Sequence, residues 1–234
     1  ILFVPVLGSR QVPASMKIGL ILFTSIVIFP LVQARPLPEP QGIFDLAVFL
    51  LSDVTIGLGI AFITRLIFAA VQIAGTVVDF QMGFGVVNVI DPQTDTQVSV
   101  TAQFHNIVAV LIFLAVDAHH FILQAIVESF LIINPAEISF ADITPEYMLH
   151  LFSGTFTTAV KIAAPIMAIL FFLSVGLGLV ARTVPQMNVF IVGFPLQIGV
   201  GLLMVGLSIS FFSMLVQQQI YELPGKFMGF LRAL

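Results

Sequence analysis

The sequence contains no cysteine, no tryptophan and only two tyrosines, and only 9% of its 234 residues are charged. Without cysteine, disulfide frameworks, thiolate metal sites and cysteine nucleophiles are excluded. The scarcity of charge excludes an ordinary soluble domain, in which about 25% of residues are charged. The net charge is -4 and no basic run occurs, so the chain lacks the electrostatic footprint of a nucleic-acid-binding protein.

What the sequence does contain is mostly apolar, with 59% hydrophobic residues and a mean hydropathy of +1.14. A soluble protein of this composition would lack the polar surface that must cover its core. The composition therefore predicts a membrane protein surrounded by lipid or by other subunits. Because tryptophan and tyrosine are scarce, the aromatic belt of ordinary membrane-spanning helices is nearly missing, which predicts an unusual placement in the bilayer.

Apolar runs separated by polar or proline-rich segments predict the helices, over residues 18–32, 43–80, 98–133, 147–181 and 184–220. The first run is barely long enough to span about 30 Å of hydrocarbon at 1.5 Å per residue, whereas the second is far longer than one crossing requires. Small residues four positions apart predict close helix pairing. These pairs are Gly57/Ala61, Ala70/Ala74, Ala159/Ala163 and Ala164/Ala168.

Local signals mark three further boundaries. Thr144, Pro145 and Glu146 have the pattern of a helix cap, a first helical residue and an acidic first turn, so a long helix should begin there. The stretch "DAHH", residues 117–120, predicts a hairpin tip or break, with two half-length helices folded back on each other. The chain opens at Ile1 without a charged leading region, so we expect a truncated N-terminal helix and not a signal peptide.

Ionisable residues lie within the apolar runs, where a lipid-facing charge costs about 2.5–3.5 kcal/mol. They include Asp45, Asp53, Arg65, Asp79, Asp117 and Lys161. We therefore expect these side chains to face protein or water. They could form the substrate site of a secondary transporter, or they could meet partners and line a shared pore in a channel subunit. The uneven runs do not divide into two matching transporter halves, which favours the subunit.

No motif of a metalloprotease, nucleophile-elbow hydrolase or phosphate-binding loop occurs in the sequence. The best candidates for metal or acid–base chemistry are His105, Asp117, His119, His120 and Glu128. Zinc needs three or four converging ligands, whereas adjacent helical residues such as His119 and His120 point about 100° apart. We therefore expect no enzymatic activity, no metal and no cofactor.

Three stretches resemble, in order and approximate spacing, signature segments of the FliR family of flagellar export-gate proteins, which includes injectisome counterparts. They are "RQVPASMKIGLILFTSIVIFP", "DFQMGFGVVNVIDP" and "ARTVPQMNVFIVGFPLQIGVGLLM". The resemblance extends from Gly8 to about Leu215, and the form "VFIVGFP" is similar to the flagellar branch.

The resemblance implies an all-α membrane protein of long kinked helical hairpins, stacked in a helical multi-subunit export gate, with residues 1–234 as a single integral-membrane domain. It implies a non-enzymatic subunit in the bacterial inner membrane at the flagellar basal body. With FliP-like and FliQ-like subunits it would form the channel for unfolded flagellar proteins, beside FlhB-like and FlhA-like components and membrane lipid. An injectisome gate and a secondary transporter are the alternatives.

The resemblance also implies a pore-blocking plug loop at residues 83–103. Its matching positions are Gly83, Phe84, Val86, Val87, Val89, Ile90, Asp91 and Pro92. An apolar constriction excludes ions by dewetting and still yields to a polypeptide. The alternative is an interhelical loop packed against a neighbour. A second set is expected to be structural, as a helix break that sets a hairpin angle and packs on partners: Arg182, Pro185, Asn188, Phe190, Gly193, Phe194 and Pro195.

Overall fold

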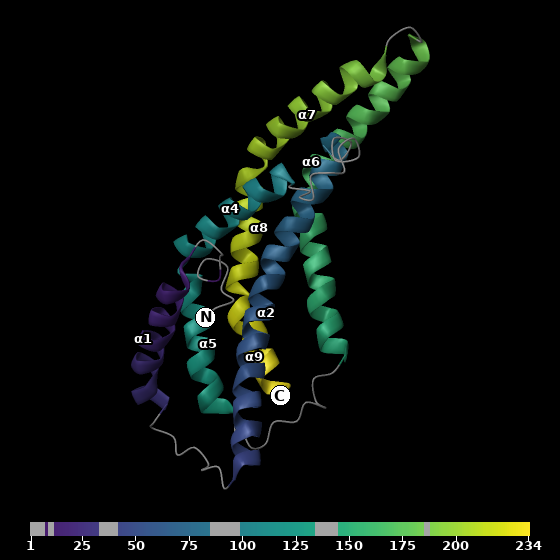
Figure 1. Ribbon diagram of the computed structural model, residues 1–234. Helices are drawn as coiled ribbons and strands as arrows, with labels where there is room; N and C mark the ends of the chain where they lie inside the picture. The colour runs from purple at the N-terminus through teal and green to yellow at the C-terminus, as the bar shows by residue number, and fades with distance from the viewer. Residues whose placement is uncertain (1–7, 9–11, 33–41, 85–98, 134–144, 185–187) are drawn as a thin grey trace. The chain divides into compact units, whose positions relative to one another are not determined.

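The computed structural model describes residues 8, 12–32, 42–84, 99–133, 145–184 and 188–234, and the regular structure in these ranges is α-helical. The helices are α1 (Ala14–Val32), α2 (Ile43–Met82), α4 (Val100–Ala115), α5 (Ala118–Ile132), α6 (Pro145–Thr183), α7 (Val189–Leu207), α8 (Ile209–Tyr221) and α9 (Leu223–Arg232) (Figure 1). Within the described ranges, three helices are long and apolar enough to cross a membrane, and the number of spans rises to five if each bent helix pair counts as one. The predicted all-α membrane class is confirmed.

Proline occurs both at the start of a helix and inside the apolar helices of this chain. Helix α6 begins at Pro145, as predicted, although Thr144 lies outside the described residues. Pro30, Pro165 and Pro195 lie inside α1, α6 and α7. Membrane helices tolerate internal proline because neighbouring groups and local adjustments satisfy the freed backbone carbonyls.

The predicted break at "DAHH" is confirmed. Helix α4 ends at Ala115, α5 begins at Ala118, and the two helices are bent by 64° at this point. Asp117 lies between them in the left-handed backbone region, with φ 52°. A 64° bend changes the direction of the chain without reversing it, so the expectation of two half-helices folded back on each other was wrong.

The last apolar run, predicted over residues 184–220, contains two helices, α7 and α8. Helices α7 and α8 meet at Ser208 with a bend of 54°. Backbone hydrogen bonds continue on both sides of Ser208, because its amide donates to Met204 O and its carbonyl accepts from Phe212 N, both at 2.9 Å. Gly/Ser pairs are common kink sites, so Gly206 and Ser208 carried a signal that the prediction missed.

The chain divides into two compact units, the first made of residues 1–67, 113–153 and 218–234. Its core includes the apolar face of α9, which buries Leu223, Phe227, Phe230 and Leu231. In this unit α1 lies against α5, and α5 against α9 (Figure 1). The Tyr147 hydroxyl donates to the carbonyl of Lys226 at 2.8 Å, which ties the start of α6 to α9.

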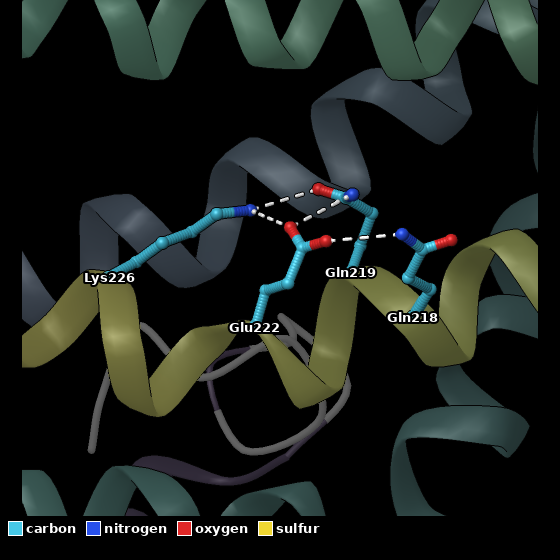
Figure 2. Close-up of polar contacts among 4 residues, drawn as sticks. All are labelled: Gln218, Gln219, Glu222 and Lys226. Atoms are coloured by element: carbon cyan, nitrogen blue, oxygen red, sulfur yellow. Dashed lines mark hydrogen bonds and ion pairs between the residues drawn. The ribbon is translucent and has the colours of Figure 1, made fainter.

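A polar network spans the junction of α8 and α9 in the same unit. Figure 2 shows Gln218, Gln219 and Lys226 converging on the Glu222 carboxylate. Lys226 Nζ lies 3.1 Å from Glu222 Oε2 and 2.9 Å from Gln219 Oε1. The two glutamine amides donate to the same carboxylate at 3.3 and 3.1 Å. The charged pair Lys226–Glu222 therefore finds its hydrogen-bond partners within about one helical turn of the junction between α8 and α9.

The second unit comprises residues 68–112 and 154–217. Small residues allow its helices to approach closely, as predicted for the pairs Ala70/Ala74 and Ala159/Ala163, all of which are buried. Gly75 of α2 lies close to Ala102 of α4, and a Cβ added to Gly75 would overlap the Ala102 backbone. Close contact of this kind requires glycine at position 75.

We predict that Gly75→Ala destabilises the chain by about 1–3 kcal/mol, because the added methyl group overpacks the contact with Ala102. Gly57→Ala is the matched control on the same helix, since a Cβ there meets nothing within 4 Å. The control should be neutral or stabilising by up to about 1 kcal/mol, as expected for replacing an interior helical glycine. The measurement is the aggregation temperature of the detergent-solubilised chain. Equal values for the two variants would contradict the assigned packing.

Candidate functional site

The predicted plug loop begins where α2 ends. Gly83 and Phe84 are described and half-buried, whereas Val86, Val87, Val89, Ile90, Asp91 and Pro92 lie outside the described residues. Residues 100–103, the last part of the predicted loop, form the first turn of α4. We call the described residues on either side of this segment the loop base. It consists of Asp79, Gln81, Met82 and Gly83 at the end of α2, and of Ser99 and Thr101 at the start of α4.

Ser99 caps the N-terminus of α4. Its hydroxyl oxygen accepts a hydrogen bond from Ala102 N at 3.0 Å, and its carbonyl accepts the first helical bond from Gln103 N at 3.0 Å. Serine favours this position because the hydroxyl satisfies an amide that has no partner within the helix.

Asp79 adds a second cap to α4 from the neighbouring helix α2. Its carboxylate accepts hydrogen bonds from the Ser99 hydroxyl and from Thr101 N, the latter at 3.2 and 3.3 Å to its two oxygens. Asp79 is only 5% exposed. A carboxylate is favoured at a helix N-terminus, where the amides and the helix dipole are positive. This interaction holds both ends of the intervening segment together, and it confirms that Asp79 faces protein.

Gly83 makes the sharp turn at the end of α2. Its φ is +89°, a backbone conformation that residues with a Cβ rarely adopt, and its amide donates to Phe80 O at 3.2 Å. A Cβ at this position would also lie 2.7 Å from the Phe194 ring. The structure therefore brings together one residue from each predicted set, Gly83 and Phe194.

The end of α2 makes a hydrogen bond to α6 and a close packing contact with α7. Gln81 Nε2 donates to the carbonyl of Met167 at 3.2 Å. The Met82 side chain is fully buried, and a Cβ added to Gly201 would lie 2.5 Å from its sulfur. Gln197 of α7 donates to the Ser174 hydroxyl of α6 at 3.0 Å. These contacts join residues far apart in the chain, so residue spacing could not predict them.

His105 lies on α4, about one helical turn after Thr101 of the loop base. Its Nδ1 donates to Thr101 O at 2.9 Å, and its ring packs on Phe212 with centroids 4.7 Å apart. Its Nε2 and the Thr101 hydroxyl are buried without a hydrogen-bond partner among the described residues. His105 does not join the other candidate ligands, because Asp117, His119 and His120 gather at the α4–α5 break.

The second predicted set surrounds the turn between α6 and α7. Arg182 lies exposed in the last turn of α6, and Asn188 caps α7 through a hydrogen bond from Ile191 N to its side-chain oxygen at 3.4 Å. Gly193 is buried, while Pro195 lies exposed in an uninterrupted part of α7. The helical interruption in this stretch therefore precedes Pro195. Pro185 and the side chain of Phe190 lie outside the described residues.

Long apolar helices, internal charges and tight glycine contacts define an α-helical membrane protein. The profile of Bacterial export proteins, family 1, matches residues 1–223. The flagellar biosynthetic protein FliR of Bacillus subtilis is 40% identical over 210 residues, which cover 88% of this chain and 80% of that protein. FliR of Aquifex aeolicus is 31% identical over 205 residues, covering 88% and 79% of the two chains.

A more distant relative, Yop proteins translocation protein T of Yersinia pestis, is 27% identical over 183 residues, which cover 76% of this chain and 69% of that protein. The chain therefore belongs to family 1 of the bacterial export proteins, and the predicted resemblance to FliR is confirmed.

We predict that Asp79→Asn loosens the loop base. Loss of the carboxylate weakens the interaction with the Ser99 hydroxyl and the Thr101 amide, at a cost of about 1–3 kcal/mol, or roughly 5- to 150-fold in the opening equilibrium. Because the chain has no cysteine, Thr101→Cys supplies a single reporter at a position that is 2% exposed. The measurement is the rate of N-ethylmaleimide labelling in mild detergent, which should rise in the Asp79→Asn background.

Asp53→Asn is the matched control, because Asp53 lies on the same helix but is exposed. It should leave the labelling rate of the reporter unchanged. If both substitutions accelerate labelling equally, the cap formed by Asp79 does not hold the start of α4.

Proposed function

We propose that this chain is a non-enzymatic subunit of the flagellar type III protein export gate in the bacterial inner membrane, at the flagellar basal body. With FliP-like and FliQ-like subunits it forms the channel through which unfolded flagellar proteins pass, next to FlhA-like and FlhB-like components. The observation that carries the proposal is the family match over residues 1–223. The flagellar branch is favoured over the injectisome branch because the FliR of Bacillus subtilis is 40% identical and the Yersinia translocation protein 27%.

Charged residues on exposed helix faces support a subunit within an assembly. Asp53 of α2 and Lys161 of α6 are exposed, and both have apolar neighbours in the sequence. On insertion scales each charge costs about 2.5–3.5 kcal/mol at the centre of a bilayer, so these faces require protein or water. Partner subunits and a shared channel supply both.

The loop base supports the proposed plug. Asp79 and Ser99 hold the two ends of the segment together, and Gly83 turns the chain out of α2. The residues between them include Val86, Val87, Val89 and Ile90. An apolar segment whose two ends are held together is suited to closing a pore to ions and to yielding when a polypeptide enters.

The first test of the proposed function is a pull-down. The tagged full chain, extracted in mild detergent, should co-purify with FliP-like and FliQ-like proteins, and it should accumulate poorly without them. Lys161→Glu should lower partner recovery, whereas Lys161→Arg, which keeps the charge, should not. A monodisperse monomer that binds a small-molecule substrate would favour a secondary transporter instead.

The second test addresses the plug. Replacement of residues 84–92 by a Gly/Ser stretch of equal length should leave the gate assembled but permeable to ions, because the apolar constriction is lost while Asp79 and Ser99 still join the loop ends. Membrane conductance is the measurement, and protection of the Cys reporter at position 101 confirms an intact loop base. The matched control is Asp91→Asn. Unchanged conductance in an assembled gate would contradict the plug proposal without contradicting the proposal that the chain is a gate subunit.

A further inference from the structure

Asp117, His119 and His120 gather at the break between α4 and α5. One potential ligand atom from each residue lies within 4.8 Å of those of the other two. The two imidazole rings have centroids 4.2 Å apart and an interplanar angle of 38°. The divergence expected for adjacent helical residues is therefore not observed between these two rings. We propose that this cluster binds one divalent transition-metal ion.

The ligand set selects the class of metal. Two imidazoles and one carboxylate suit zinc, nickel or copper(II), whereas calcium and magnesium favour sites built from oxygen alone. The chain has no cysteine, so no thiolate competes for the ion. Three protein ligands leave at least one position open for water or for a group from a partner.

The carboxylate of Asp117 is available for coordination. Asp117 occupies the N-cap position of α5, where an aspartate ordinarily accepts a hydrogen bond from a first-turn amide. Here it makes no such side-chain bond, and its backbone lies at φ 52° and ψ 32°. Its carbonyl accepts from His120 N at 2.9 Å, which fixes the first turn of α5. The side chain that would cap the helix lies near the two imidazoles instead.

His119 supplies a second observation that points to a ligand. Its Nδ1 is buried and has no hydrogen-bond partner among the described residues. An unsatisfied buried polar atom costs about 1–3 kcal/mol, and coordination by this nitrogen would remove that cost.

The cluster must contract slightly to hold an ion. Ligand atoms in a tetrahedral zinc site lie roughly 3.3 Å apart, given metal–ligand distances of about 2.0–2.2 Å. Asp117 and His120 are exposed, so rotation of their side chains can close the remaining distance without repacking the core. Because its ligands lie on both the junction residue and the first turn of α5, the bound ion would fix the backbone at the break.

The test uses the full chain in mild detergent, purified through a tag without histidine and titrated with Zn²⁺ against a chromogenic chelator. One ion per chain is expected. Asp117→Asn, His119→Gln and His120→Gln should each weaken binding at least about tenfold. Asparagine keeps the tolerance of position 117 for the left-handed region. The matched control is His150→Gln, which changes an exposed histidine on α6 and should bind as the unsubstituted chain does.

Two further readouts separate coordination from a purely structural role. Electron paramagnetic resonance of the Cu²⁺-loaded chain should show coupling to two imidazole nitrogens, reduced to one in His120→Gln. Zn²⁺ should raise the melting temperature of the unsubstituted chain but not of Asp117→Asn, because an ion that binds only the folded form stabilises it. Absence of nitrogen coupling, or Zn²⁺ affinity that is unchanged by all three substitutions, would overturn the proposal.

Discussion

The Asp79 carboxylate against the N-terminus of α4 is the interaction on which the second unit depends. It joins residues separated by a segment that begins at Gly83, and it does so through buried hydrogen bonds to Ser99 and Thr101. A charge-assisted bond to helix amides is stronger than a neutral one, particularly where water is excluded. These hydrogen bonds fix the start of α4 against the end of α2.

Close contacts at glycines also hold the helices together around the loop base. Gly75 admits the Ala102 backbone, Gly201 admits Met82, and Gly83 admits the Phe194 ring. Without water to drive association inside a membrane, helices associate through close packing and interhelical hydrogen bonds, and both occur here. The polar appearance of "DFQMGFG" in an apolar sequence follows from these demands, because Asp79 caps one helix, Gln81 bonds another and Gly83 turns the chain.

Local signals predicted much of the fold. The bounds of α2, the start of α6 at Pro145 and the break at "DAHH" follow from apolar run length, proline and clustered polar residues. The bend at Ser208 was missed because it leaves the backbone hydrogen bonds largely intact and interrupts no apolar run. The pairing of Asp79 with Ser99 and the contact of Gly83 with Phe194 could not be read from spacing, since each depends on which helices pack together. The proximity of the His119 and His120 rings could not be read from spacing either, since it depends on how the two side chains turn in the first turn of α5.

The lengths of α2 and α6 limit how lipid can cover the surfaces of these helices. Helices α2 and α6 contain 40 and 39 residues. At 1.5 Å per residue each is about 60 Å long, roughly twice the thickness of the hydrocarbon core. Their surfaces remain apolar along much of this length, with exposed residues such as Phe44, Phe80, Leu149 and Leu179 near the two ends of each helix. Lipid alone covers both ends of such a helix only if the helix is steeply tilted, whereas contact with protein covers them at any tilt. The composition that first indicated a membrane protein therefore also suits a subunit of the export-apparatus complex that membership of this family implies.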